Sequence, residues 1–209
     1  MIDFILTITA SLITVIAYVI YYLDIKKQSI IPSRFSWIIW SLTASLETLT
    51  YSYVSDDNLK SVCFVTSSLC CVLITAKIWT SSDRKVPNWA ESSLAFCTVS
   101  LAIWLLFKSP LFAHILLLMA IPIAFLPTYK NALNNYENEN SKAWLLWSIS
   151  DLLMIVIIVI RLKAFKELPY AVVEFVCHFS VFVIIFYKQN IGAKGLYTRT
   201  SRIRKVSVS

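Results

Sequence analysis

The sequence predicts an all-α polytopic membrane protein with seven transmembrane helices, arranged as two parallel three-helix repeats joined by a linker helix. Hydrophobic residues make up 58% of the chain and charged residues only 15%, against roughly 25% charged residues in a soluble domain. The apolar residues gather in runs of about 20, which is the length that a helix needs to cross about 30 Å of hydrocarbon. Matching segments at one fixed offset predict the repeats.

Short stretches that carry charges, prolines or asparagines separate the apolar runs. Unpaired backbone groups are costly in lipid, so each run forms either a helix or a strand of a closed barrel. Barrel strands have only about 10 residues, so we expect helices. The first run lacks the basic flank and cleavage site of a signal peptide and is expected to be retained. We expect spans at about 4–23, 35–54, 61–79, 89–107, 110–129, 143–161 and 168–187.

The distribution of basic residues predicts the orientation. With seven spans, about 14 Lys and Arg fall on one side of the membrane and about 5 on the other. Lys and Arg collect in cytoplasmic loops, so we expect the N-terminus outside and the C-terminus in the cytoplasm, in a plasma membrane or a bacterial inner membrane. Because the charges lie in short separate clusters, we expect no nucleic-acid partner. The basic tail 188–209 is expected to attract anionic lipid in the bilayer.

An internal repeat appears when the chain is shifted on itself by about 107 positions. Ser-Trp-Ile-Ile-Trp-Ser at 36–41 recurs as Ala-Trp-Leu-Leu-Trp-Ser at 143–148, and Cys70 meets Cys177. A unit of three spans reverses the direction of the chain, and one linker helix restores it, so the repeats run parallel. We expect a first repeat at 1–80, a linker helix at 81–108, a second repeat at 109–187 and the tail at 188–209.

Two segments carry a resemblance to a known superfamily. Leu-Pro-Thr-Tyr-Lys at 126–130, followed by a polar loop and the Trp-bearing segment 141–147, resembles a PQ-loop repeat in which Thr128 replaces the glutamine. The segment 32–40 resembles the start of a second helix in the same superfamily. The resemblance implies the plan of the SWEET transporters, two three-helix repeats and one linker helix. In that plan polar residues of the third and seventh helices meet the substrate, which implies Ser67 and Glu174.

Tryptophans and carboxylates share helical faces. Trp40 and Glu47 lie on one face of the second span, and the same spacing recurs as Trp147 and Asp151 on the sixth. The Trp-x-x-Trp-x-x-x-Asp pattern that ends at Asp151 also resembles the bacterial nicotinamide-riboside (vitamin) transporters. Two aromatic walls with carboxylates suit a flat polar solute. Alternatively, the tryptophans belong to interfacial belts, and Asp151 only accepts an interhelical hydrogen bond.

Other ionisable residues and prolines fall within the predicted spans. Glu174 and His178 are four residues apart, so they share a face and form either a proton relay or a neutral structural pair. His114 follows the start of the fifth span by one turn, and we expect it at the wetted outer interface. Pro122 and Pro127 each remove a backbone donor from that span, which makes a hinge or a static kink.

Together these features predict a transporter that moves a small polar solute (a sugar, vitamin or nucleoside-like molecule) by alternating access between the repeats. The alternative is a non-transporting PQ-loop-like receptor, chaperone or assembly factor. The sequence has no nucleophile-elbow or zinc motif, so we expect no enzymatic activity, no cofactor and no metal. Related folds also associate, which leaves room for a homo-oligomer. The candidate substrate-binding residues are Trp40, Glu47, Ser67, Trp147, Asp151, Glu174 and His178, with Pro122 and Pro127 as hinges.

Overall fold

The computed structural model describes residues 1–54, 58–79, 95, 97–99, 101–102, 105–106, 108–161 and 165–206. Within this part of the chain the secondary structure is entirely helical, as the sequence predicts. The helices are α1 (Ile2–Lys26), α2 (Arg34–Val54), α3 (Asn58–Ile78), α5 (Pro110–Asn134), α6 (Ser141–Ile160) and α7 (Leu168–Val206), with short 3-10 helices η1 (Tyr136–Asn138) and η2 (Phe165–Glu167).

Five of these helices are long and apolar enough to cross a membrane. They are α1, α3, α5, α6 and the part of α7 up to Ile191. Large apolar side chains cover the outside of the bundle, and Leu69, Leu73 and Phe112 are each more than 60% exposed. A surface of this kind fits a lipid bilayer and would be an aggregation liability in water.

The two other expected spans, 35–54 and 89–107, are not among the five apolar helices. The expected span 35–54 forms α2, but its serines, threonines, Arg34 and Glu47 keep α2 out of the apolar class. The expected span 89–107 lies mostly outside the described residues, although those of its residues that are described are helical. The expected tail 188–209 does not begin as a separate backbone segment. Helix α7 continues without a break from the bundle to Val206.

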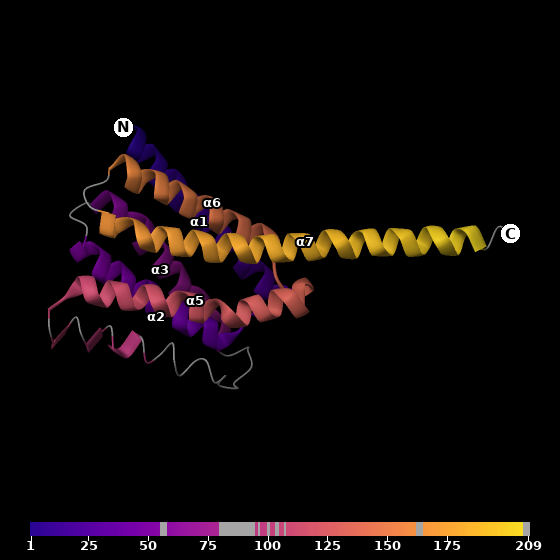
Figure 1. The fold of residues 1–209 in the computed structure, drawn as a ribbon, viewed down its shortest axis with the longest axis horizontal. Helices are drawn as coiled ribbons and strands as arrows, with labels where there is room; N and C mark the ends of the chain where they lie inside the picture. The colour runs from indigo at the N-terminus through magenta and orange to yellow at the C-terminus, as the bar shows by residue number, and fades with distance from the viewer. Residues whose placement is uncertain are drawn as a thin grey trace.

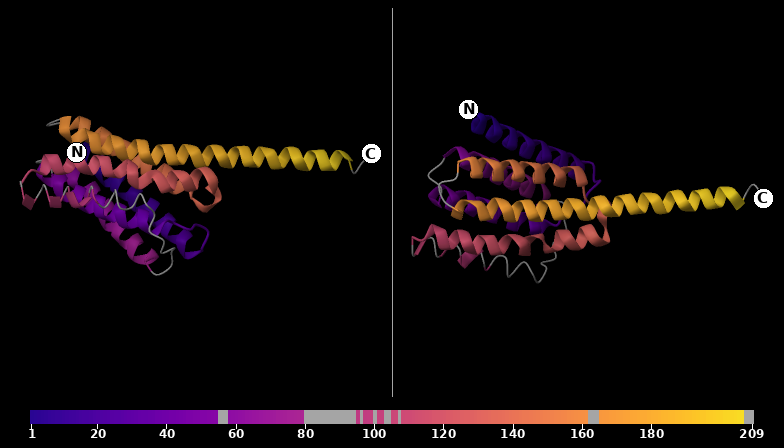
Figure 2. Two further views of the ribbon diagram at one scale, coloured as in Figure 1. Left: turned by 60° about the horizontal axis from the view of Figure 1, so that its bottom comes forward. Right: turned by 45° about the horizontal axis from the view of Figure 1, so that its top comes forward.

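The helices pack side by side in one bundle (Figure 1), and along the chain they form two groups, α1 to α3 and α5 to α7. In the first group α3 contacts both α1 and α2, and in the second group α7 contacts both α5 and α6. Between the groups α1 contacts α6, and α2 contacts α5. The other views show the same bundle, with α7 leaving it at one end (Figure 2).

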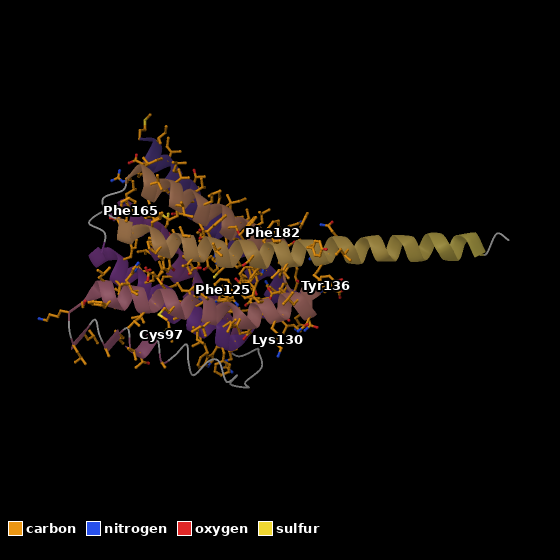
Figure 3. The ribbon with its side chains drawn as sticks, in the orientation of Figure 1. Cys97, Phe125, Lys130, Tyr136, Phe165 and Phe182 are labelled. Carbon is orange, nitrogen blue, oxygen red and sulfur yellow. The ribbon has the colours of Figure 1, made fainter. Side chains whose placement is uncertain are left out.

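Two ends of the bundle are used as reference points below. The tail end is where residues 135–140 connect α5 to α6 and where α7 leaves the bundle. The N-terminal end holds Met1 and η2. Figure 3 labels Tyr136 and Lys130 at the tail end, Phe165 at the N-terminal end and Phe125 between them.

Local chemistry explains where the helices of the second group begin. Pro110 opens α5, where the backbone donor that proline lacks has no helical partner anyway. The helix then runs unbroken through Pro122 and Pro127, the two expected hinges. The side chain of Asn140 caps α6 by accepting hydrogen bonds from the backbone N–H groups of Lys142 (2.8 Å) and Ala143 (3.3 Å).

Several hydroxyl groups inside the bundle are hydrogen-bonded locally or across helices. The Ser148 hydroxyl donates to the backbone carbonyl of Trp144 one turn earlier, at 2.8 Å. Between the two helix groups, the hydroxyls of Thr14 on α1 and Ser150 on α6 lie 2.6 Å apart. These bonds let a helix carry polar residues at depth without leaving them unpaired.

Candidate functional site

A small cavity lies at mid-height in the bundle, at the level of Phe125 (Figure 3). Its free volume is about 70 Å³, well below the roughly 300–1,000 Å³ of typical small-molecule pockets. All six described α-helices line it. Its aromatic residues are Tyr18, Trp37, Trp40, Phe64, Phe125, Trp144, Trp147 and Tyr170, and its ionisable and hydroxyl residues include Ser67, Asp151, Glu174 and His178.

The two Trp-x-x-Trp segments meet at this cavity. The ring centroids of Trp37 and Trp40 lie 5.2 Å apart, and those of Trp144 and Trp147 lie 5.0 Å apart. Trp40 and Trp144 join the two pairs edge to face at 6.0 Å. Trp37, Trp144 and Trp147 are each less than 5% exposed. A belt at the headgroup level requires rings that reach the interface, so the belt alternative is wrong for these three.

Asp151, Glu174 and His178 form one cluster on the wall of the cavity. The imidazole Nδ1 of His178 lies 2.7 Å from a carboxylate oxygen of Asp151 and 3.7 Å from one of Glu174. The ring of Trp147 stacks on the imidazole, with centroids 5.7 Å apart and planes 28° apart. The sequence paired His178 with Glu174, but the shorter contact is made to Asp151 on the neighbouring helix α6.

Two indole N–H groups at the cavity have no partner among the described residues. They belong to Trp40 and Trp147, and both nitrogens are buried. A buried indole N–H normally finds an acceptor. These two donors are therefore free to bind an acceptor on a molecule that enters the cavity.

Ser67 also lines the cavity, where its hydroxyl lies 3.2 Å from the phenolic oxygen of Tyr18. The structure thus brings six of the seven candidate binding residues to one place, and Glu47 is the exception. Its carboxylate is fully buried and lies 2.6 Å from Nδ1 of His114, away from the cavity lining.

His114 is placed differently from the sequence expectation. It was expected at a wetted interface, but its side chain is only 1% exposed. The expectation was wrong because this side of α5 packs against α2, so a residue one turn from the helix start is covered by its neighbour. Tyr170 and Tyr51 also approach the imidazole, with ring centroids 6.3 and 6.4 Å away.

A buried ion pair at the N-terminal end was missed from sequence. Lys60 and Glu167 pair with side chains 0% and 1% exposed. In the sequence both residues lie in the charged stretches that separate the predicted spans. Their separation of 107 residues equals the repeat offset, so opposite charges at matching positions were the signal available.

A second missed carboxylate lies at the tail end. Glu139 follows η1 in a segment that the sequence identified only as a polar loop, yet it is 6% exposed. Its carboxylate accepts hydrogen bonds from the side chains of Asn131 (3.0 Å), Trp144 (3.1 Å) and Tyr21 (3.4 Å). Burial raises the pKa of Glu139 to about 7, against the lowering effect of these three donors.

Comparisons with known proteins add no name to this site. No family model, curated protein or solved structure matches the chain.

Proposed function

We propose that the protein is a membrane transporter that carries a small polar solute through the central cavity by alternating access. The observation that carries this proposal is the closed aromatic cavity between the two helix groups, with a carboxylate–imidazole cluster and two unpartnered indole donors on its wall. Binding near mid-height between two halves is the arrangement that alternating access requires.

The packing of the helices supports two related halves. When α1, α2 and α3 are replaced in turn by α5, α6 and α7, the α1–α3 and α2–α3 contacts become α5–α7 and α6–α7. These are the contacts of the second group. The same exchange turns the α1–α6 contact into the α5–α2 contact. Together with the sequence offset of about 107, this supports the proposed parallel repeats, the SWEET-like plan and a linker formed by 81–108.

The chemistry of the wall supports a class of solute. Of the described residues, no lysine or arginine lines the cavity, whereas Asp151 and Glu174 supply carboxylates. Aromatic faces attract flat rings and cations. We therefore propose a flat solute with a positive charge or several N–H or O–H donors, and with one acceptor for the indoles.

Contacts at the two ends support a closed conformation. At the N-terminal end Lys60 of the first group pairs with Glu167, which directly precedes α7. At the tail end Glu139 joins α1 to α5 and α6. A cavity of about 70 Å³ holds only water-sized molecules, so one end has to open before a solute enters.

Tryptophan fluorescence of the protein in liposomes tests this proposal. Nucleosides, vitamins, sugars and amino acids are titrated in turn into the native protein, Trp147→Phe and Trp79→Phe. Trp79 is the matched control because it is 55% exposed, at the end of α3. We expect a saturable change in the native protein and in Trp79→Phe, and a smaller change with weaker apparent affinity in Trp147→Phe, whose cavity still holds Trp37, Trp40 and Trp144. A response in Trp147→Phe with the native amplitude and affinity would place binding elsewhere and contradict the proposal.

One observation favours a second candidate, a membrane receptor or assembly factor. Helix α7 continues from Ile191, where its apolar stretch ends, to Val206 outside the bundle (Figure 1). This part of the chain contains five of the six basic residues of the tail. If truncation after Ile191 abolishes activity while Trp147→Phe has no effect, the second candidate replaces the transporter.

A further inference from the structure

The connection between α5 and α6 buries a carboxylate that the cavity does not account for. Glu139 is 6% exposed, whereas Glu137 two residues earlier is exposed. Polar loops normally keep their carboxylates in water, because burying a charge is costly unless it is paired. The position of Glu139 therefore requires a specific explanation.

The hydrogen bonds of Glu139 join the two helix groups. One oxygen accepts from the Asn131 amide on α5, and the other accepts from the Trp144 indole on α6 and the Tyr21 hydroxyl on α1. Tyr21 belongs to the first group and the other two residues to the second. Separating α1 from α5 and α6 at the tail end would thus break at least one of these bonds.

Glu139 also lies between two spaces. It lines a cleft of about 650 Å³ at the tail end, and Trp37 and Trp40 line both this cleft and the central cavity. Trp144, which binds Glu139 through its indole N–H, lines the cavity as well. The carboxylate therefore holds part of the partition that separates the cavity from the tail-end cleft.

Among the residues that the structure describes, no cation pairs with the carboxylate of Glu139. The other charged side chains near this end of the described structure are Asp24 and Lys26 on α1, Lys27 directly after it, Arg34 on α2, Lys77 on α3, Lys130 on α5, Glu137 in η1, Lys142 on α6 and Lys188 on α7. The titratable phenols there are Tyr21, at hydrogen-bonding distance from Glu139, and Tyr22, Tyr129, Tyr136 and Tyr187. Asp24 bonds to Asn140, and Arg34 lies over the ring of Trp79. The three partners of Glu139 are neutral donors.

We propose that Glu139 is a proton-binding latch, which holds the tail end closed while protonated and favours its opening when it ionises. The proposal rests on the proposed function, because it assumes that the cavity opens toward this end. Protonation at the oxygen near Tyr21 removes the uncompensated charge. The carbonyl oxygen still accepts from Asn131, and the new hydroxyl donates to the Tyr21 oxygen while it accepts from the Trp144 indole. Opening exposes the carboxylate to water, where the ionised form is stable.

Linkage gives the size and sign of the effect. The pKa of Glu139 is about 7 in the closed protein and returns toward 4.5 in water. The closed form then binds the proton more tightly, so the closed-to-open ratio rises as the pH falls from 7 to 4.5, by up to about 300-fold. Opening between pH 4.5 and 7 also releases up to one proton at this end, and about half a proton on average at pH 7, which would couple the cycle to protons.

Infrared difference spectroscopy of the reconstituted protein measures the proton directly. We expect the band of a protonated, buried carboxyl group to disappear with a midpoint near pH 7. Glu47 and Glu174 also carry carboxyl groups inside the bundle, so the band of Glu139 is taken as the difference between the native protein and Glu139→Gln. The band should be retained in Glu137→Gln, the exposed control on the same loop. A midpoint near 4.5 for Glu139 would show a hydrated carboxylate and overturn the proposal.

Thiol labelling measures the opening. Cys71 lines the central cavity and is 5% exposed, so we use a protein in which Cys63, Cys70, Cys97 and Cys177 are replaced by serine. A membrane-impermeant maleimide is added on the side that carries residues 135–140. At each pH the labelling rate is divided by the rate measured for the same protein with Glu139→Gln. This ratio removes the effect of pH on the ionisation of the Cys71 thiol.

We expect this ratio to rise between pH 5 and pH 8, and to rise equally in the Glu137→Gln protein. A ratio that stays flat, or a rise that depends on Glu137, would overturn the latch. Neither measurement uses a solute, so a working latch in a protein that binds no solute would count against the transporter alone. Solute binding with a flat ratio would count against the latch alone.

Discussion

At the scale of single residues, the main question is how charged side chains are kept inside an apolar bundle. Lys60 and Glu167 are fully buried against each other, and the carboxylate of Asp151 contacts the imidazole of His178. Moving one charge into a medium of low dielectric constant costs several kcal/mol, and only a well-placed partner offsets it. Each of these residues therefore depends on its partner more than on its own helix.

The Lys60–Glu167 pair yields a stability prediction. Lys60→Met leaves Glu167 buried without a partner, and we expect it to destabilise the protein by about 3–5 kcal/mol. Glu167→Met should do the same for Lys60. The double variant should recover most of the loss, because it removes both charges. Thermal unfolding in detergent measures all three, and a double variant as unstable as the sum of the singles would contradict the pairing.

Glu139 yields a prediction for stability against pH. Its pKa is raised from 4.5 to about 7 by burial, so between these values the native state holds a proton that the unfolded chain has lost. The contribution of Glu139 to stability is therefore fully present below pH 4.5 and is lost as the pH rises through 7, by about 3 kcal/mol in total. Glu139→Gln should remove this slope and Glu137→Gln should keep it. The measurement is Tm at a series of pH values.

At the scale of elements, α5 differs from the other helices because it carries two internal prolines. Proline at position 127 cannot donate to the carbonyl of Ile123, so the helix is weakest just before the tail-end cleft that Pro127 lines. Pro122 is exposed on the outside of the bundle. The helix is continuous through both, and bending at either remains a prediction.

Replacing each proline tests which of them bends. Pro127→Ala restores a backbone hydrogen bond, and we expect slower maleimide labelling of Cys71 together with a higher Tm. Pro122→Ala restores a similar bond away from the cleft, and should raise Tm without changing the labelling rate. Equal labelling rates in both variants and the native protein would identify the prolines as static kinks.

At the scale of the whole molecule, the apolar runs predict helices and the fixed offset predicts matching parts. The burial of Glu139 and His114 could not be predicted, because burial depends on which helix faces which. Sequence periodicity locates a face of α5 but does not name α2 as its neighbour. The aromatic cavity was easier to predict, because Trp40 and Trp147 occupy matching positions in segments that recur.

The number of spans is the last prediction, and it decides how the termini lie. We predict seven crossings, made by the five apolar helices, by α2 and by the segment 89–107, and an odd number of crossings places the termini on opposite sides of the membrane. Single cysteines at Ile2 and Ser209 should then react with an impermeant reagent from opposite sides of a vesicle. Reaction of both from the same side would mean an even number of crossings and would contradict the seven-span plan.

A second pair of cysteines separates seven crossings from five. Ser29 follows α1 and Asn58 begins α3, so they lie on opposite sides only if α2 crosses the bilayer. We expect Ser29→Cys to react on the side of Ser209 and Asn58→Cys on the side of Ile2. Glu47 and its partner His114 make this outcome physically reasonable, because α2 buries its carboxylate against α5 and not in lipid. Labelling of both on one side would leave α2 at the membrane surface and remove the matching of α2 with α6.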